Sequence, residues 1–383
     1  MVASKGKIRV LNAIRQGLIG GGESHVLSLV ENVDRMLYDP SVLSFTDGPM
    51  ISRLNEMGVQ THVIQSKRAF DVFKWYKIRS LLQRESIDIV HVHGTRAASN
   101  LLWASKSCGI PVIYTIHGWS FHDDQTGVTR WLRTKSEQIL TRNASLNISV
   151  SSSNRQTGVK HFPRFSSVIV NNGIDLDKFN PFTEYSDVRG ELGIPRDKLL
   201  VTFAARMTLQ KAPLIMLSAF KELTREYDNV VLLMVGEGDL RDEAERLAVE
   251  LELQNRVIFQ NFRSDMAAIL SQSDIFCLPS FWEGMPIGLL EAMAMKNAVI
   301  ATMVDGSKEI IENNENGLLI PANSAQKMAE GLLELCKDSD KRKRLQENAY
   351  LTVARGYNVQ TMAAEISSIY SKVYSKSIKS EIG

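Results

Sequence analysis

Short runs of β-branched and other apolar residues alternate with longer stretches of helical periodicity, and this alternation constrains the fold most. The helical patterns include residues 24–37 and 97–107. Strands that are apolar on both faces and separated by helices are typical of a parallel sheet covered on both sides. The first series of runs predicts strands at residues 8–14, 42–45, 61–64, 87–91, 111–116, 146–150 and 168–170.

A polar segment at residues 175–198, broken by proline and glycine, separates this series from a second one. Two successive series predict an α/β protein of two Rossmann-like, doubly wound domains that face each other across a cleft. We place the domains at residues 1–178 and 179–360, and expect a helix in 361–383 to pack back on the first. The second series predicts strands at residues 199–205, 230–235, 256–259, 275–278, 298–301 and 318–320.

The composition of the 383 residues, 44% hydrophobic and 23% charged, excludes disordered, collagen-like and disulfide-stapled classes. The longest aliphatic run, residues 230–235, is far shorter than the ~20 residues of a membrane-spanning helix. Cys108, Cys277 and Cys336 are too widely spaced to indicate a disulfide framework or a zinc site. Because the first residues also lack a signal-peptide core, we expect a reduced, cytoplasmic protein.

Charge is distributed unevenly along the chain. Residues 1–180 hold 22 Lys and Arg against 14 Asp and Glu, whereas the remainder holds 23 against 29. The basic half favours a phosphate-bearing acceptor, an anionic lipid surface or nucleic acid. No zinc finger or RNA-binding signature supports nucleic acid, so we expect none as a partner.

The segment 67–84 has two interpretations. Ile78, Leu81 and Leu82 have the spacing of a helix that covers a sheet. Its first half mixes Phe70, Phe73 and Trp75 with cations, which suits a membrane surface. An ordinary surface helix remains the simpler interpretation.

The most informative motif follows the strand at 274–278. Pro286 is suited to the first position of a helix, with Glu283 before it and Glu291 in its second turn. Glu291 is the only charge in an apolar helix, where a carboxylate is costly unless it meets a polar partner. Amides at the helix start bind anions well, which makes these residues donor-binding candidates: Gly284, Met285, Pro286 and Ile287.

A second motif, Arg206 and Lys211, follows the strand at 199–205. Ligands bind at the carboxyl ends of strands in open α/β sheets. An Arg fork and a mobile Lys charge suit a diphosphate group. A solvated basic loop is the alternative interpretation.

In the N-terminal half, a glycine-rich turn containing Gly21 and Gly22 follows the first strand and opens a helix. Glycine lets the backbone approach a phosphate or sugar closely. The spacing does not match the dinucleotide fingerprint G-x-G-x-x-G.

His117 ends the fifth strand, and His91 and His93 alternate on the fourth. A metal site at His91 and His93 lacks an acid or Cys cluster that would complete it, so we predict core or cleft-lining roles.

Together, Glu283, seven intervening residues and Glu291, preceded by Arg206 and Lys211, resemble the nucleotide-sugar-dependent glycosyltransferases of family 4. The resemblance covers nearly the whole chain and implies the GT-B fold and retention of anomeric configuration. It implies that Glu291 holds the donor ribose, that Arg206 and Lys211 hold the leaving diphosphate, and that Glu283 faces the donor sugar. A family residue matching His117 contacts the donor sugar. Ala212 stands where the family usually has Gly.

The family's glycine turn implies a place for Gly21 and Gly22 beside the donor phosphates and the acceptor. Asp175 and Asp177 match the D-x-D motif that binds manganese in a different glycosyltransferase fold. Here they follow an Asn-Gly turn that resembles a metal-free segment of family 4. We therefore interpret both as capping residues at a hinge and predict no metal.

These observations predict a retaining, metal-independent glycosyltransferase without a cofactor. Its donor would be a nucleoside-diphosphate sugar, with UDP-sugar preferred from the resemblance, and its acceptor a glycan or lipid-linked glycan of exopolysaccharide or capsule synthesis. We expect it in the cytoplasm or peripherally on the inner face of the membrane. The alternatives are a nucleotide-sugar epimerase of the same fold and a non-catalytic, two-lobed sugar-binding protein.

Overall fold

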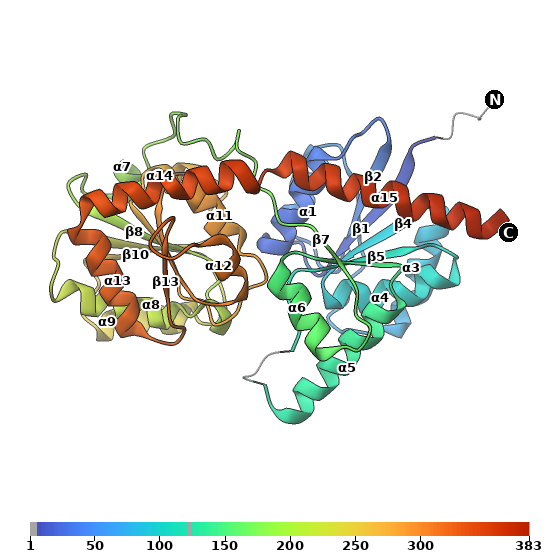
Figure 1. Cartoon of the computed structure of the whole chain (residues 1–383), viewed down its shortest axis with the longest axis horizontal. Coiled ribbons are helices and arrows are strands. Elements are labelled where there is room, and N and C mark those ends of the chain that lie inside the picture. The colour runs from blue at the N-terminus through green and yellow to red at the C-terminus, as the bar shows by residue number, and fades with distance from the viewer. Residues whose placement is uncertain (1–5, 122–124, 383) are drawn as a thin grey trace. The chain divides into compact units, whose positions relative to one another are not determined.

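The computed structural model describes residues 6–121 and 125–382 and divides into two compact units (Figure 1). The first comprises Met1–Gly173 with Val359–Gly383, and the second comprises Ile174–Asn358. Each is an α/β unit around its own parallel sheet. The two successive Rossmann-like folds predicted from the sequence are therefore confirmed.

The first unit contains a seven-stranded sheet in which all neighbouring strands are parallel. Its order is β3-β2-β1-β4-β5-β6-β7, so the direction of winding reverses between β1 and β4. In sheets of this kind, ligands bind outside the carboxyl ends of the strands at that reversal. The strands are β1 (Ile8–Ile14), β2 (Tyr38–Ser44), β3 (Gln60–Val63), β4 (Ile89–His93), β5 (Val112–Ile116), β6 (Leu146–Ser149) and β7 (Val168–Ile169).

Helices cover both faces of this sheet, as continuous apolar strands require. Apolar side chains of α3, α4 and α5 pack on one face, and those of α1, α2 and α15 on the other. The last helix of the chain thus belongs to the first unit. The helices are α1 (Gly21–Asn32), α2 (Pro49–Glu56), α3 (Val72–Arg84), α4 (Thr95–Ser107), α5 (Gly127–Asn143), α6 (Ser152–His161) and α15 (Val359–Ile382).

The second unit repeats the topology with six parallel strands in the order β10-β9-β8-β11-β12-β13. Winding reverses between β8 and β11, whose residues Ile275 and Val201 are paired. The loops that follow these two strands therefore leave the sheet side by side. The strands are β8 (Leu199–Ala204), β9 (Val230–Val235), β10 (Val257–Gln260), β11 (Ile275–Leu278), β12 (Ala298–Thr302) and β13 (Leu318–Ile320).

Apolar helices also cover the second sheet. Its largest cluster of buried side chains joins the sheet to α8, α9 and α13, and a smaller cluster joins it to α7 and α10. The helices are α7 (Val188–Leu192), the 3-10 turn η1 (Leu209–Lys211), α8 (Pro213–Thr224), α9 (Arg241–Glu250), α10 (Met266–Ser271), α11 (Ile287–Ala294), α12 (Asp305–Ile310), α13 (Ala325–Lys337) and α14 (Ser339–Gly356).

Several element boundaries differ from the sequence prediction. Strand β2 begins at Tyr38 rather than residue 42, because its first residues pair with β1 despite Pro40. Strand β4 is displaced toward its carboxyl end and finishes at His93. Helix α15 begins at Val359, two residues before the predicted start, and ends at Ile382. None of the described helices is long and apolar enough to span a membrane.

Candidate functional site

The two charged motifs of the second unit lie on the loops that follow β8 and β11. Lys211 and Glu283 form an ion pair across these loops, and their side chains are 17% and 5% exposed. Beside the pair, Gln210 Nε2 donates to the Trp282 carbonyl oxygen at 2.9 Å. The Phe281 amide donates to the Gln210 carbonyl oxygen at 2.8 Å. The structure therefore brings together two motifs that are 72 residues apart.

Arg206 lies at the start of the same loop system with an exposed side chain. It forms no ion pair with another described residue, in contrast to Lys211. The loop ends at Ala212, where the backbone is left-handed with a φ of 49°. This conformation is costly for a residue with a Cβ atom, which accounts for the glycine usual at this position in family 4. Arg206 thus offers a free cation at the carboxyl edge of the sheet.

Helix α11 begins immediately after the second loop. Pro286 was predicted as the first residue of this helix. It occupies the N-cap instead, so the helix begins one residue later, at Ile287. Met285, Pro286 and Ile287 are buried, so only part of this helix start faces solvent. The backbone around Gly284 packs tightly, because a Cβ on Gly306 would lie 2.3 Å from the Gly284 carbonyl oxygen.

Glu291 lies in the second turn of α11, as predicted, and its side chain is half-buried. Burial raises the pKa of its carboxyl group to about 7, and the nearby positive charge of Lys178 lowers it in part. Removal of a carboxylate from water favours its protonated form. A ligand that donates hydrogen bonds to Glu291 would favour the ionised form again.

Two glycines that were not predicted as site residues position the loop of Arg206. Gly236 and Gly238 follow β9 and have φ values of 139° and 155°. A Cβ on either would lie within 2.3 Å of a carbonyl oxygen in the Arg206 loop, at Ala205 or Met207. Only glycine permits this approach of two backbones. The signal was available as a G-x-G sequence at the end of an apolar strand.

In the first unit, Gly21 and Gly22 open helix α1 as the sequence predicts. Gly21 is exposed, and a Cβ added to Gly22 would lie 3.7 Å from the His117 ring. His117 follows β5 and is half-buried. The structure therefore places the glycine turn against the strand-end histidine at the carboxyl edge of the first sheet.

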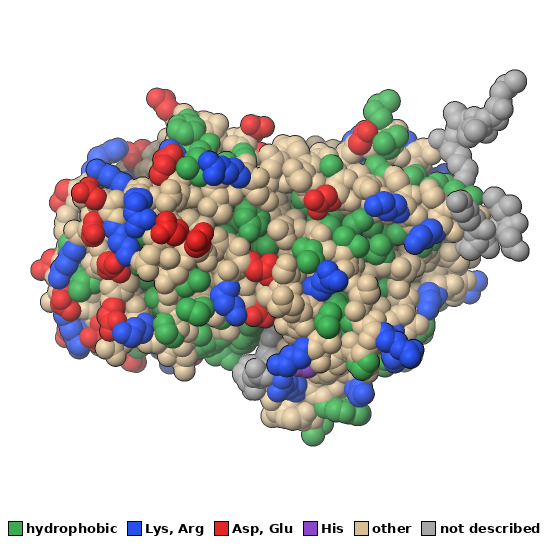
Figure 2. Space-filling model, in the orientation of Figure 1, with side chains coloured by type: hydrophobic (Ala, Val, Ile, Leu, Met, Phe, Trp, Pro, Cys, Tyr) green, Lys and Arg blue, Asp and Glu red, His purple; other side chains and the backbone are tan. Residues whose placement is uncertain are grey.

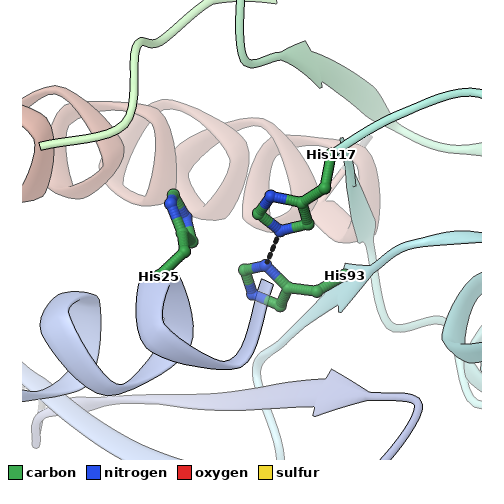
Figure 3. Close-up of side chains that lie close together, drawn as sticks. All are labelled: His25, His93 and His117. Carbon is green, nitrogen blue, oxygen red and sulfur yellow. Dashed lines mark hydrogen bonds between the residues drawn. The ribbon is translucent and has the colours of Figure 1, made fainter. Parts of the chain in front are cut away.

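Two further histidines lie beside His117 (Figure 3). His25 comes from α1 and His93 from the end of β4, and each is 2% exposed. His93 Nδ1 lies 3.1 Å from His117 Nε2 at hydrogen-bond distance, and His93 Nε2 lies 3.3 Å from Asn12 Oδ1. His25 was not predicted to join this group, because its position on α1 resembles an ordinary core position.

The packing of the three imidazoles against one another favours their neutral forms. Burial lowers the pKa of His25 to about 4, and the hydrogen bond to Asn172 raises it in part. Burial also lowers the pKa of His93 and His117, and the neighbouring imidazoles lower it further. A neutral imidazole keeps one nitrogen lone pair for a hydrogen bond or a metal ion.

His91 has a different environment from His93, although both lie on β4. Its Nδ1 lies 2.7 Å from the Tyr370 hydroxyl of α15, and its Nε2 lies 2.7 Å from the Thr115 hydroxyl. Both ring nitrogens are therefore occupied by hydrogen bonds. A core position is one of the two roles, core or cleft-lining, that the sequence predicts for His91.

Asp175 caps the turn that enters the second unit. Its Oδ1 accepts hydrogen bonds from the backbone amides of Asp177 and Lys178 at 3.0 and 3.1 Å. These bonds use the carboxylate oxygen locally, as expected of a capping residue. Asp175 and Asp177 are not part of any group of three potential metal ligands in the described chain.

Exposed apolar side chains gather on α3 and α5, the helices on either side of α4. On α3, Phe73 and Tyr76 are 89% and 84% exposed, whereas Trp75 is half-buried. On α5, Trp131 is 59% exposed beside exposed Arg and Lys side chains. On the face in Figure 2, most charged side chains of the first unit are Lys and Arg.

Comparison with known families divides the chain as the fold does. Residues 19–178 match the family described as Glycosyltransferase Family 4. Residues 185–352 match the family described as Glycosyl transferases group 1. The two matches together span most of both units.

Among curated proteins, the chain is 26% identical to the UDP-Gal:alpha-D-GlcNAc-diphosphoundecaprenol alpha-1,3-galactosyltransferase of Escherichia coli, with 97% of this chain and 98% of the relative covered. It is also 26% identical to the phosphatidyl-myo-inositol mannosyltransferase of Mycolicibacterium smegmatis, with 95% and 93% covered. Among solved structures, Anabaena HepE in complex with UDP and glucose superposes with a TM-score of 0.84 at 20% identity, with 95% and 100% covered. This similarity supports the GT-B fold.

Proposed function

Because the chain belongs to the GT-B glycosyltransferases of family 4, we propose that it transfers a sugar from a nucleoside-diphosphate donor to a hydroxyl of a lipid-linked or polysaccharide acceptor. The observation that carries this proposal is the ion pair of Lys211 with Glu283, which joins the loops after β8 and β11 at the topological reversal of the second sheet. Members of the family transfer sugars from nucleotide sugars, so an epimerase or a non-catalytic binding protein is not favoured.

The charges of the second unit suit the departure of a diphosphate. Cleavage of the bond between the sugar and the diphosphate leaves negative charge on the phosphate oxygens, and fixed cations stabilise that charge. Arg206 supplies an exposed guanidinium with no competing carboxylate among the described residues. Lys211 supplies a second cation, held in place by Glu283. We assign both to the leaving diphosphate.

Glu283 has two tasks in this proposal. Its carboxylate holds Lys211 toward the edge of the sheet. We also assign it to the hydroxyl groups of the donor sugar. Glu291 accepts hydrogen bonds from the ribose hydroxyls of the donor. Gly284, Met285, Pro286 and Ile287 form the wall beside the phosphates, and the close contact of Gly306 with Gly284 keeps this wall rigid.

We further propose that transfer retains the anomeric configuration and requires neither metal nor cofactor. The leaving phosphate acts as the base that accepts the proton of the attacking hydroxyl, on the same face of the sugar. Fixed cations then take the role that a divalent metal has in other transferases. Transfer in the presence of EDTA tests the metal claim, and the NMR coupling constant at the new glycosidic bond tests retention.

We assign the first unit to the acceptor and to the sugar of the donor. Gly21 and Gly22 leave room for a substrate near the backbone, and His117 lies against them with a half-buried imidazole. His117 positions the donor sugar through one ring nitrogen.

The acceptor that we favour is a lipid-linked glycan, with UDP-sugar as the donor. The E. coli relative acts on a diphosphoundecaprenol-linked sugar and the mycobacterial relative on a phosphatidylinositol, so both acceptors carry phosphate and lipid. Exposed Phe73, Tyr76 and Trp131 lie among Lys and Arg residues, a combination that suits an anionic membrane surface. We therefore propose that the protein works peripherally on the inner face of the membrane.

The test is a transfer assay with the full chain, UDP-sugars and a short lipid-diphosphate acceptor. Acceptor-dependent release of UDP, together with a product heavier by one sugar, supports the proposal. A second, matched assay uses Glu291→Gln and the remote Glu330→Gln. We expect a large loss of activity for the first variant and none for the second. Conversion of the donor without any acceptor would identify an epimerase or hydrolase instead.

A further inference from the structure

We propose that His25, His93 and His117 form a binding site for one transition-metal ion of the Zn²⁺ class. These residues offer one nitrogen each, and the three nitrogen atoms lie within 4.8 Å of one another. The side chains come from α1, β4 and the end of β5, and Figure 3 shows them around a common centre. The ion has no part in the sugar transfer proposed above, although the site shares His117 with the proposed contact to the donor sugar.

The spacing of the rings suits a single ion. Their centroids lie 4.7 Å apart for His25 and His117, 5.4 Å for His25 and His93, and 5.3 Å for His93 and His117. Zinc binds imidazole nitrogen at about 2.0–2.1 Å, so three imidazoles around a tetrahedral ion have centroids roughly 5 Å apart. Small rotations of the three rings are therefore enough to bring the nitrogens onto one ion.

His25 offers the clearest ligand atom. Its Nδ1 donates a hydrogen bond to Asn172 Oδ1 at 2.9 Å, which leaves the lone pair on Nε2. That Nε2 is buried and has no hydrogen-bond partner in the described structure. A buried polar atom without a partner is costly, and a bound ion would satisfy it. Asn172 also fixes the ring, as an outer-shell partner of a metal-binding histidine usually does.

His93 is oriented in the same way. Its Nε2 donates to Asn12 Oδ1 at 3.3 Å, which leaves a lone pair on Nδ1. That lone pair accepts the hydrogen bond from His117 Nε2. When an ion binds, the proton of His117 moves from Nε2 to Nδ1, so that both facing nitrogens offer lone pairs. The ion then replaces one hydrogen bond by two metal–nitrogen bonds, without a net change in protons.

The ligand set selects the class of ion. Three neutral imidazoles without a carboxylate suit Zn²⁺, Co²⁺, Ni²⁺ or Cu²⁺, and disfavour Mg²⁺, Ca²⁺ and Mn²⁺, which prefer oxygen ligands. No Asp, Glu or Cys within residues 6–121 and 125–382 joins the group. The fourth coordination position is left for water or a substrate hydroxyl, as in metal sites with three protein ligands.

An ion at this site would remove His117 from its proposed contact with the donor sugar. Zinc should therefore inhibit transfer, and this consequence rests on the proposed function. Binding of the ion does not depend on that function, because it is measured without any donor. A chain that binds zinc but transfers no sugar would overturn the proposed function and leave the site intact.

The experiment uses the full chain without a purification tag, stripped with EDTA and dialysed. Calorimetry with ZnCl₂ should show one ion per chain. Binding should weaken at least tenfold in His25→Gln and in His93→Gln, and also in Asn172→Ala, which removes only the outer partner of His25. The control His161→Gln removes a histidine of the same unit that bonds to the Thr157 carbonyl and should bind like the wild type.

A spectroscopic measurement keeps the test independent of how well the variants fold. The wild-type chain with one equivalent of Co²⁺ should show the intense visible absorption of a four-coordinate ion, and added Zn²⁺ should remove it. Absence of one-to-one binding, or a weak spectrum typical of an octahedral ion, would overturn the proposal. Unchanged affinity in both folded His25 and His93 variants would also overturn it.

Discussion

Lys211 and Glu283 form an ion pair that joins the loop after β8 to the loop after β11, 72 residues further along the chain. Glu283 is almost fully buried and Lys211 is mostly buried. The pair therefore fixes the position of a cation at the carboxyl edge of the second sheet. It also explains why a carboxylate occurs in a loop that we expect to bind a negatively charged donor.

Removal of one partner should destabilise the second unit. In Glu283→Gln the Lys211 charge stays in a poorly hydrated place without its counter-charge, so we expect a loss of about 3 kcal/mol in the free energy of unfolding. Urea denaturation measures the free energy of unfolding of the variant and the wild type. Glu330→Gln breaks the exposed pair Lys327–Glu330 in the same unit and should leave the free energy of unfolding unchanged within the error of the measurement. Equal losses in both variants would contradict this account of the buried pair.

Nucleotide binding should tighten as pH rises through the pKa of Glu291. This pKa is about 7 because burial favours the protonated carboxyl, and ribose hydroxyls should favour the ionised form. Between pH 6 and 8 we expect roughly a tenfold gain in affinity for UDP, with release of protons. Calorimetry in buffers of different ionisation enthalpy measures both.

The variant Glu291→Gln is the control for this pH dependence. It should bind UDP more weakly than the wild type, and its affinity for UDP should not increase in the same way between pH 6 and 8. The raised pKa of Glu291 has the opposite effect on stability: the free energy of unfolding falls as pH rises. The stabilising contribution of the protonated carboxyl is complete below pH 4.5 and is lost as pH rises through about 7. If wild type and variant show the same slope of affinity with pH, Glu291 is not the group that titrates.

Acid should destabilise the first unit through His25. Its pKa is about 4 in the folded chain and 6.5 in the unfolded chain, so the unfolded chain binds more protons between these values. The stabilising contribution is complete above pH 6.5 and is lost as pH falls toward 4, by roughly 3 kcal/mol. His25→Gln should flatten the decline in melting temperature over this range, whereas His161→Gln should keep it. A decline of equal slope in all three proteins would assign acid sensitivity to other groups.

Vesicles should bind the chain through α3 and α5. Phe73 and Trp131 are exposed among basic residues, so we expect co-sedimentation with vesicles containing anionic lipid at low salt, and less at high salt. Phe73→Ser and Trp131→Ser should each weaken binding several-fold. Val249→Ser, which changes an exposed apolar residue of the second unit, should leave it unchanged. Failure of the wild type to bind anionic vesicles at low salt would contradict the proposed membrane association.

The sequence predicted the architecture because strand and helix patterns are local. Strands β1, β9 and β13 have the bounds that the apolar runs predict, and Glu291 lies in the second turn of its helix. The order of the strands follows from the general rule for doubly wound sheets. Boundaries were less accurate where other forces act, as at β2, which pairs with β1 across Asp39 and Pro40.

Contacts between distant segments could not be predicted in the same way. The pairing of Lys211 with Glu283 depends on the order of β8 and β11 in the sheet and on the course of two irregular loops. The meeting of His25 with His93 depends on the rotation of α1 about its axis, and a histidine on an apolar helix face gives no sign of it. The G-x-G sequence of Gly236 and Gly238 is visible locally. Nothing in the sequence shows that these glycines contact the backbone at Ala205 and Met207.

The most direct test of the central claim is transfer itself. The purified chain is incubated with UDP-sugars and a lipid-diphosphate-linked acceptor in EDTA, and mass spectrometry follows the acceptor while a coupled assay follows UDP. We predict an acceptor that gains one hexose-type unit, UDP released in equal amount, and loss of both in Glu291→Gln. UDP release without any sugar on an acceptor, or transfer that persists undiminished in Glu291→Gln, would contradict the account.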